Sequence, residues 1–160
     1  MPTSPVGRIN SARGVTLLEM MVVVTLIAIL AGLTFPSISS GLDSLRLRSA
    51  SDSILALLNT AADRANRRQQ AVEVVISPKE NSITARSADN GFARHLDLRE
   101  GIHITAITPG NPPYDAIRQF VIYPGGTVPG VVIEIASGGG HKRTVALDPV
   151  TGVARAEIEK

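Results

Sequence analysis

The sequence lacks cysteine and tryptophan and is poor in aromatic residues. None of its 160 residues is cysteine, which excludes disulfide bonds, thiolate metal sites and cysteine nucleophiles. Aromatic residues make up only 3% of the chain, so a folded core must be built mainly from Val, Ile, Leu and Ala. The charged fraction of 19% and the hydrophobic fraction of 44% are otherwise typical of a globular protein of about one domain.

The chain also lacks net charge once its first 14 residues are set aside. It has 16 basic and 14 acidic residues, and Arg8 and Arg13 are the only charged residues before Val15. The remainder is therefore neutral. A neutral domain does not favour nucleic-acid binding by bulk charge, which leaves only a local basic patch as a means of binding.

A long apolar run follows the basic start. In residues 15–35 only Glu19 is charged, and a helix of these 21 residues spans about 30 Å, the thickness of a hydrocarbon core. The run predicts a transmembrane helix at 15–36, and Arg8 and Arg13 favour a cytoplasmic N-terminus. A cleaved secretory signal is the alternative, but it leaves Glu19 unexplained and TFPSISSG (34–41) is a poor cleavage site.

The stretch RGVTLLE (13–19) resembles the processing signal of type IV pilins and of the pseudopilins of type II secretion. The resemblance implies that a prepilin peptidase cuts after Gly14 and that the new amine of Val15 is N-methylated. It also implies that Glu19 pairs with the terminal amine of a neighbouring subunit, which gives a charge in a spanning helix its partner. Family members usually have Phe where this chain has Val15, and Pro36 matches a proline common where their helices leave the membrane. The alternative for Glu19 is a solvated side chain at the membrane surface.

Beyond Pro36 the apolar residues first keep a helical spacing and then alternate. The helical spacing predicts that the helix continues to about Gln69, with a bend near Pro36 and Gly41. Its apolar stripe consists of Leu47, Ala50, Ile54, Leu57, Leu58, Ala61 and Ala65. Eight short stretches after Gln70 read as strands between Gly, Pro and Asn turns. They are AVEVVIS (71–77), SITAR (82–86), RHLDL (94–98), IHITAI (102–107), RQFVIY (118–123), VVIEIA (131–136), TVALD (144–148) and VARAEI (153–158).

The predicted fold class is therefore α+β. A long N-terminal helix, membrane-spanning in its first half and amphipathic in its second, packs on an antiparallel β-sheet domain of about eight short strands. LREGIHI (98–104) and the stretch from FVIYPGG (120–126) to the DPVTG hairpin (148–152) are similar to the minor pseudopilins of the H type, the GspH/FimT family. The resemblance implies a leader at 1–14 that is removed, an assembly helix at 15–36, an amphipathic helix at 37–70 and a periplasmic β-domain at 71–160.

The function that the resemblance implies is assembly and not catalysis. The chain would be a minor pseudopilin of a type II secretion system in the bacterial inner membrane, with its N-terminus in the cytoplasm and its C-terminal domain in the periplasm. Its partners would be the prepilin peptidase, other pseudopilins or pilins, the membrane and secreted proteins, and it would need no cofactor. The runner-up is a minor pilin of a type IV pilus, and some fimbrial members of the family bind DNA during uptake. A membrane-anchored enzyme is a third class, for which the sequence offers no motif.

The basic residues are the candidates for DNA contact. Arg64, Arg67 and Arg68 lie near the helix end, where they either complement the helix dipole or contact a phosphate backbone. Lys142 and Arg143 stand in SGGGHKRT (137–144), which lacks the spacing of a phosphate loop and predicts a flexible hairpin loop. The last candidate, Arg155, is followed by Glu157 and Glu159, so we do not expect DNA to be a partner.

The histidines give no sign of a metal site. His95, His103 and His141 are scattered without ligand spacing, although His95 and Asp97 alternate along a predicted strand and would share a face. We predict no metal site and no catalytic residues.

Overall fold

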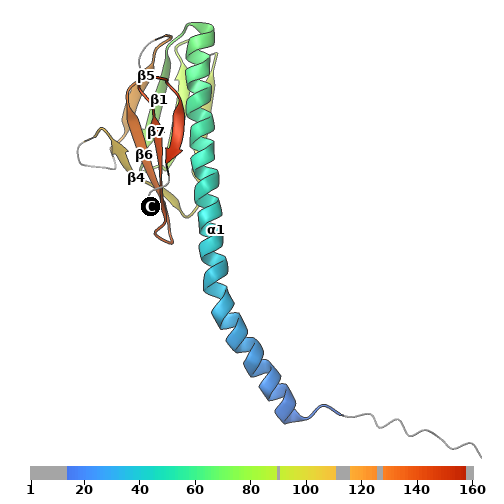
Figure 1. Ribbon diagram of the computed structural model, residues 1–160. Coiled ribbons are helices and arrows are strands. Elements are labelled where there is room, and N and C mark those ends of the chain that lie inside the picture. The colour runs from blue at the N-terminus through green and yellow to red at the C-terminus, as the bar shows by residue number, and fades with distance from the viewer. Residues whose placement is uncertain (1–13, 90, 111–115, 126–127, 158–160) are drawn as a thin grey trace, which may run out of the picture. The chain divides into compact units, whose positions relative to one another are not determined.

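The computed structural model describes residues 14–89, 91–110, 116–125 and 128–157, without the side chains of residues 33–40 (Figure 1). These residues form one helix and eight strands and belong to two compact units, Met1–Ile38 and Ser39–Lys160. The elements are α1 (Leu17–Arg68), β1 (Val72–Ser77), β2 (Ser82–Ser87), β3 (Ala93–Asp97), β4 (Ile102–Thr108), β5 (Arg118–Ile122), β6 (Val131–Ser137), β7 (Lys142–Leu147) and β8 (Ala154–Glu157).

In the first unit, α1 begins with a capped and strongly apolar stretch. Thr16 is the N-cap, because its hydroxyl accepts a hydrogen bond from the Glu19 N–H at 3.2 Å. The large apolar side chains that follow are exposed on this unit, among them Val22, Leu26 and Leu30. The backbone stays helical through Pro36 and Gly41, and the bend predicted there stays a prediction. Within the described residues, no helical stretch meets the length and apolarity that a membrane crossing requires.

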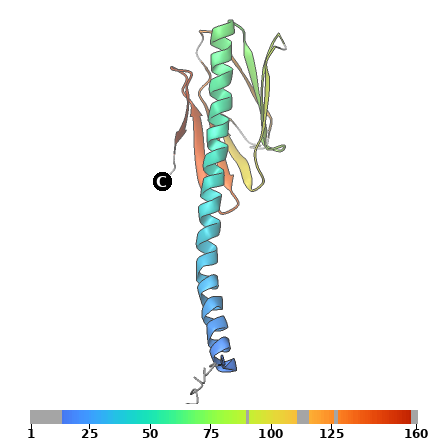
Figure 2. The same ribbon diagram turned by 90° about the vertical axis from the view of Figure 1, so that its right-hand side faces the viewer.

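The second unit contains two antiparallel sheets of four strands each. Their orders are β3-β2-β1-β5 and β4-β6-β7-β8, and every neighbouring pair is antiparallel. Figures 1 and 2 show the strands beside the part of α1 that belongs to this unit. The predicted α+β class with eight short antiparallel strands is confirmed, and the strands divide between two sheets. The division follows from the long-range pairs β1 with β5 and β4 with β6, which local sequence pattern does not reveal.

The apolar stripe of α1 forms one core with both sheets. Its seven predicted members are all at most 8% exposed, and Ile54, Ala61 and Ala65 are fully buried. They belong to the same cluster as the alternate, inward-facing residues of the strands, such as Val74 of β1 and Ile135 of β6. Aliphatic side chains supply this core, as the scarcity of aromatic residues predicts.

Asparagine side chains tie the elements of the second unit together. Asn81 lies in the turn between β1 and β2 with φ of 55°, a left-handed conformation that Asn tolerates better than most residues. Its side-chain amide donates to the Ile102 carbonyl and accepts from the Ile104 N–H at 3.1 Å, both on β4. From α1, Asn59 accepts from the Ala154 N–H of β8 at 3.0 Å. These contacts link turn, helix and edge strands.

Candidate functional site

The first turn of α1 fixes the position of Glu19. Besides the Thr16 cap, the Met20 N–H donates to the Thr16 carbonyl at 3.2 Å, so the helix starts directly after Thr16. Glu19 is then the third residue of the helix, where a carboxylate interacts favourably with the helix dipole. The spacing T-x-x-E is that of a capping box, and the bond from the Glu19 N–H to the Thr16 hydroxyl is one of the two bonds of that motif.

Gly14 and Val15 lie just before this turn and are exposed. A Cβ added at Gly14 would meet no atom of the described residues within 4 Å, apart from its chain neighbours, and Val15 is 65% exposed. The described part of the chain therefore leaves room for a side chain at position 14. A requirement for glycine there would come from another molecule that acts on this segment.

Comparisons with known proteins agree with this geometry. Residues 9–35 match the prokaryotic N-terminal methylation motif. The fold is similar to the minor pseudopilin EpsH from the type 2 secretion system of Vibrio cholerae, with a TM-score of 0.56 and 17% identity over 71% of this chain and 97% of that one. The chain therefore combines this N-terminal motif with a fold similar to that of a minor pseudopilin. No curated protein sequence matches it.

A second solved structure with a similar fold is that of a type IV minor pilin. It is the type IV minor pilin FimU of Pseudomonas aeruginosa, with a TM-score of 0.51 and 16% identity over 71% of this chain and 88% of that one. The two likenesses establish the fold. The roles predicted for Gly14, Val15 and Glu19 stay predictions, within a motif that the family model recognises.

Arg64 and Arg67, two of the three candidate arginines near the end of α1, contact acidic side chains of the chain itself. Arg64 is half-buried, lies 3.9 Å from Asp89 and stacks over the Phe92 ring at 5.8 Å from its centroid. Arg67 lies 3.9 Å from Asp63 one turn earlier, and both side chains are well exposed. The Arg64 cation therefore contacts two residues of the segment between β2 and β3. The ion pair of Arg67 is exposed and contributes little to stability, so Arg67 can exchange Asp63 for another partner at little cost.

The structure corrects the prediction that Lys142 and Arg143 lie in a flexible hairpin loop. They lie in strand β7 and not in a flexible loop, and the turn is confined to residues 138–140. Because successive side chains of a strand point to opposite faces, these two cannot form one patch. Arg155, which is paired with Ala146, lies on the face of Lys142. The register therefore separates Arg143 from the other two.

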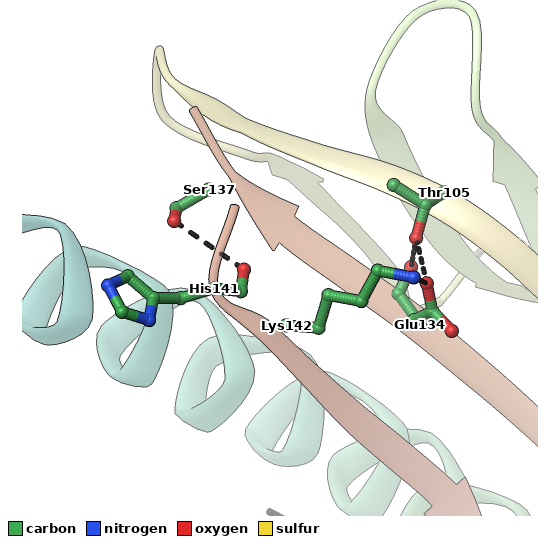
Figure 3. Close-up of polar contacts among 5 residues, drawn as sticks. All are labelled: Thr105, Glu134, Ser137, His141 and Lys142. Carbon is green, nitrogen blue, oxygen red and sulfur yellow. Dashed lines mark hydrogen bonds and ion pairs between the residues drawn. The ribbon is translucent and has the colours of Figure 1, made fainter. Parts of the chain in front are cut away.

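Lys142 also has a partner on its face of the sheet. Its ammonium group lies 2.9 Å from the carboxylate of Glu134, to which the Thr105 hydroxyl donates at 2.7 Å (Figure 3). Figure 3 shows these three side chains together on neighbouring strands, with the Ser137 and His141 contact at the turn. The hydrogen bond from Lys142, and then that from Thr105, lowers the pKa of Glu134. Glu134 thus neutralises the charge of one of the candidates for DNA contact.

The turn between β7 and β8 owes its shape to a motif whose chemistry the sequence interpretation did not identify. The Asp148 carboxylate accepts from the backbone N–H of Val150 at 2.8 Å and of Thr151 at 3.3 Å. These bonds, and then the nearby Arg155, lower the pKa of Asp148. Gly152 follows with φ of 68° and donates its N–H to the Asp148 carbonyl at 2.9 Å. An Asp that bonds the backbone two residues on is a known turn signal.

His95 and Asp97 share a face, as their alternation predicts. His95 bonds the Thr84 hydroxyl at 2.8 Å through Nδ1 and the Asp97 carboxylate at 2.9 Å through Nε2. All three side chains lie on the solvent face of β2 and β3, and those of His95 and Asp97 are 54% and 73% exposed. Within the described ranges, no group of three or more His, Asp or Glu side chains is placed to hold a metal ion.

Proposed function

We propose that the chain is a minor pseudopilin of a type II secretion system. It is cleaved after Gly14, N-methylated on Val15 and held in the inner membrane by residues 15–36, with its sheets in the periplasm. It acts by joining a filament that helps to export folded proteins. The observation that carries this proposal is the methylation motif at residues 9–35 on a fold that covers 97% of a solved minor pseudopilin.

The exposed apolar surface of the first unit supports the membrane part of the proposal. Val22, Leu26, Ile27 and Leu30 are each 51–62% exposed in the isolated chain. A helix that is apolar on all sides needs lipid or other helices around it, because exposure of so much apolar surface to water is unfavourable. Lipid before assembly and neighbouring helices after assembly provide that cover.

The capped first turn supports the assembly part. Cleavage after Gly14 creates a new amine at Val15, one residue before the Thr16 cap. Glu19 stands in the first helical turn at a position that the cap fixes. In a filament, the carboxylate of one subunit pairs with the amine of the next. A charge that is buried without its partner is costly, so this pair sets the axial register of the helices.

The test replaces Glu19 and follows incorporation into filaments in the native host. Glu19→Ala should still enter the membrane and still be cleaved, because loss of a charge makes the segment more apolar. It should cross-link poorly to the other filament subunits, and Glu19→Asp, which keeps the charge, should cross-link better than Glu19→Ala. Normal cross-linking of Glu19→Ala would mean that Glu19 is only a solvated residue at the membrane surface.

A second candidate function is that of a minor pilin, which the likeness to FimU favours. Deletion of the gene separates the two functions: loss of protein export with intact surface pili supports secretion, and the reverse result supports a pilus. For a DNA-binding pilin, the full chain in detergent would bind duplex DNA at micromolar concentration, more weakly as salt rises. We expect only weak non-specific binding, about 10⁻⁴ M or poorer. An Arg67→Ala, Arg68→Ala double variant is the control for contact at the helix end.

A further inference from the structure

Strand β3 lies at the edge of its sheet and pairs with β2 on one side only. At its two ends, the Ser87 N–H donates to the Phe92 carbonyl at 2.9 Å and the Leu98 N–H donates to the Asn81 carbonyl at 3.0 Å. Hydrogen-bonded and non-bonded pairs alternate along an antiparallel ladder, so the even-numbered residues between these ends direct their backbone groups to β2. The residues whose N–H and C=O groups face the open side are Ala93, His95 and Asp97.

Two other edge strands are partly covered by side-chain hydrogen bonds, in contrast to β3. The Asn81 amide occupies the open side of β4 by bonding Ile102 and Ile104, as a neighbouring strand would. On β8, the outward N–H of Ala154 is bonded to Asn59 of α1. The fourth edge strand, β5, follows residues 111–115, which lie outside the described residues. Among β3, β4 and β8, only β3 keeps its outward backbone groups without such a clamp.

A groove runs between the open side of β3 and α1. It has a volume of about 240 Å³, and its lining residues come from α1 and β3. The helix side is formed mostly by small side chains, which leave room for an added chain. The lining residues are Ser53, Ala56, Leu57 and Thr60 of α1 with Arg94, His95 and Leu96 of β3.

The side chains of β3 that face the groove specify what would fit there. Arg94 and Leu96 are paired with Ala85 and Ile83, two fully buried residues of β2, so they lie on the helix side of the sheet. The guanidinium of Arg94 makes no hydrogen bond or ion pair among the described residues. A charge on the inner face of an edge strand discourages pairing with an apolar strand, because the charge would be covered without a partner.

We propose that the open edge of β3 binds an extended segment of another protein by adding it as a fifth strand to this sheet. The segment carries an acidic side chain beside Arg94 and an apolar side chain beside Leu96. Main-chain hydrogen bonds to Ala93, His95 and Asp97 supply affinity, and contacts of the groove with every second side chain of the segment supply specificity. The inference does not rest on the proposed function, because it uses no residue before Ser53.

The probe is a labelled, end-blocked peptide, TVTETVT, whose Val, Glu and Val face one side when it is extended. Its order is the same in both directions, so either strand orientation brings Glu beside Arg94. The matched control is TVTKTVT. Titrated against the full chain in detergent, the Glu peptide should bind at least about tenfold more tightly than the Lys peptide, as one charge-assisted hydrogen bond predicts. Binding should slow hydrogen exchange at the amides of Ala93, His95 and Asp97.

Two variants test the edge and the charge separately. His95→Pro removes an N–H that faces outward, so the ladder to β2 survives while binding of the Glu peptide should fall about tenfold. His95→Val, which keeps that N–H, is its control. Arg94→Glu should reverse the preference in favour of the Lys peptide. Circular dichroism of each variant verifies its fold.

Three results would overturn the proposal. The first is that neither peptide binds, which would mean that Arg94 only protects the edge. The second is that the Glu peptide binds with an affinity that neither His95→Pro nor Arg94→Glu changes. The third is that no peptide binds and the chain self-associates through β3, in a way that His95→Pro abolishes. Reversal of the preference by Arg94→Glu, together with loss of binding in His95→Pro, would support it.

Discussion

Asn81 offers a quantitative test of how the two sheets are held together. Its side chain bonds Ile102 and Ile104 of β4, while its backbone lies in the turn of the other sheet. Both bonds are partly buried, so their loss leaves β4 groups without a partner. We predict that Asn81→Ala destabilises the second unit markedly, although Asn81 itself contributes nothing to the apolar core.

The magnitude follows from three contributions. Two lost hydrogen bonds cost about 1 kcal/mol each. Alanine at a φ of 55° adds about 1 kcal/mol or more, because its Cβ crowds the backbone in the left-handed region. The total is about 3 kcal/mol. Asn81→Gly avoids the backbone strain but costs about 0.5–1 kcal/mol through the greater chain entropy of the unfolded state. The free energy of unfolding of this variant should therefore still fall by roughly 2.5–3 kcal/mol.

Hydrogen exchange of the full chain in detergent measures this effect. The slowest amides of β6 report the free energy of unfolding, and the Ile104 amide reports the lost bond directly. Asn66→Ala is the matched control. Asn66 accepts a single exposed bond from the Gly125 N–H, and the better helix propensity of Ala, by about 0.5 kcal/mol, offsets much of its loss. If Asn81→Ala costs no more than Asn66→Ala, the clamp between the sheets is not a stabilising contact.

Three further predictions concern the core and the β7–β8 turn. Ser51 is fully buried and its hydroxyl has no partner among the described residues, so Ser51→Ala should raise the free energy of unfolding by about 1 kcal/mol. Ser53→Ala, which loses a hydrogen bond to the Ser49 carbonyl, should not raise it, and urea unfolding compares the two variants. Ile54→Ala should cost about 2–5 kcal/mol in the same assay, because it opens a cavity at a residue with 0% exposure. The pKa of Asp148 is lowered in the folded chain, so its carboxylate stabilises the fold above the unfolded pKa of about 3.9 and loses this effect as the pH falls through the lower, folded pKa. The midpoint temperature of thermal unfolding of Asp148→Ala should therefore be lower than that of the unchanged protein at pH 7, and the two should converge in acid. A difference in midpoint temperature that persists in acid would contradict this role of Asp148.

Local pattern predicted the elements well, because each of them has a clear period. The helix was expected from Val15 to about Gln69 and runs from Leu17 to Arg68. All eight strands occur close to their predicted positions. The exception is the start of β7, where Lys142 and Arg143 follow three glycines and His141, a composition typical of a loop. Only the pairing with β6 makes these two residues a strand.

Long-range contacts could not be predicted in the same way. The division into two sheets depends on pairs far apart in the chain, such as Val74 with Phe120. The roles of Asn59 and Asn81 depend on which strand edges lie beside them. The N-terminal motif was readable because Gly14, Val15 and Glu19 are neighbours in sequence and act as a local signal. The open edge of β3 has no local signal, since its hydrogen-bonding groups belong to the backbone.

Processing at Gly14 is the central claim, and mass spectrometry of the protein from native membranes tests it most directly. The mature chain should begin at Val15 and carry one methyl group on its terminal amine. Gly14→Leu should leave the chain uncut, because the described residues leave room for a side chain there and the peptidase would reject it. An unchanged chain that still begins at residue 1, or one that begins near Ser39 as a secretory signal would leave it, would contradict the claim.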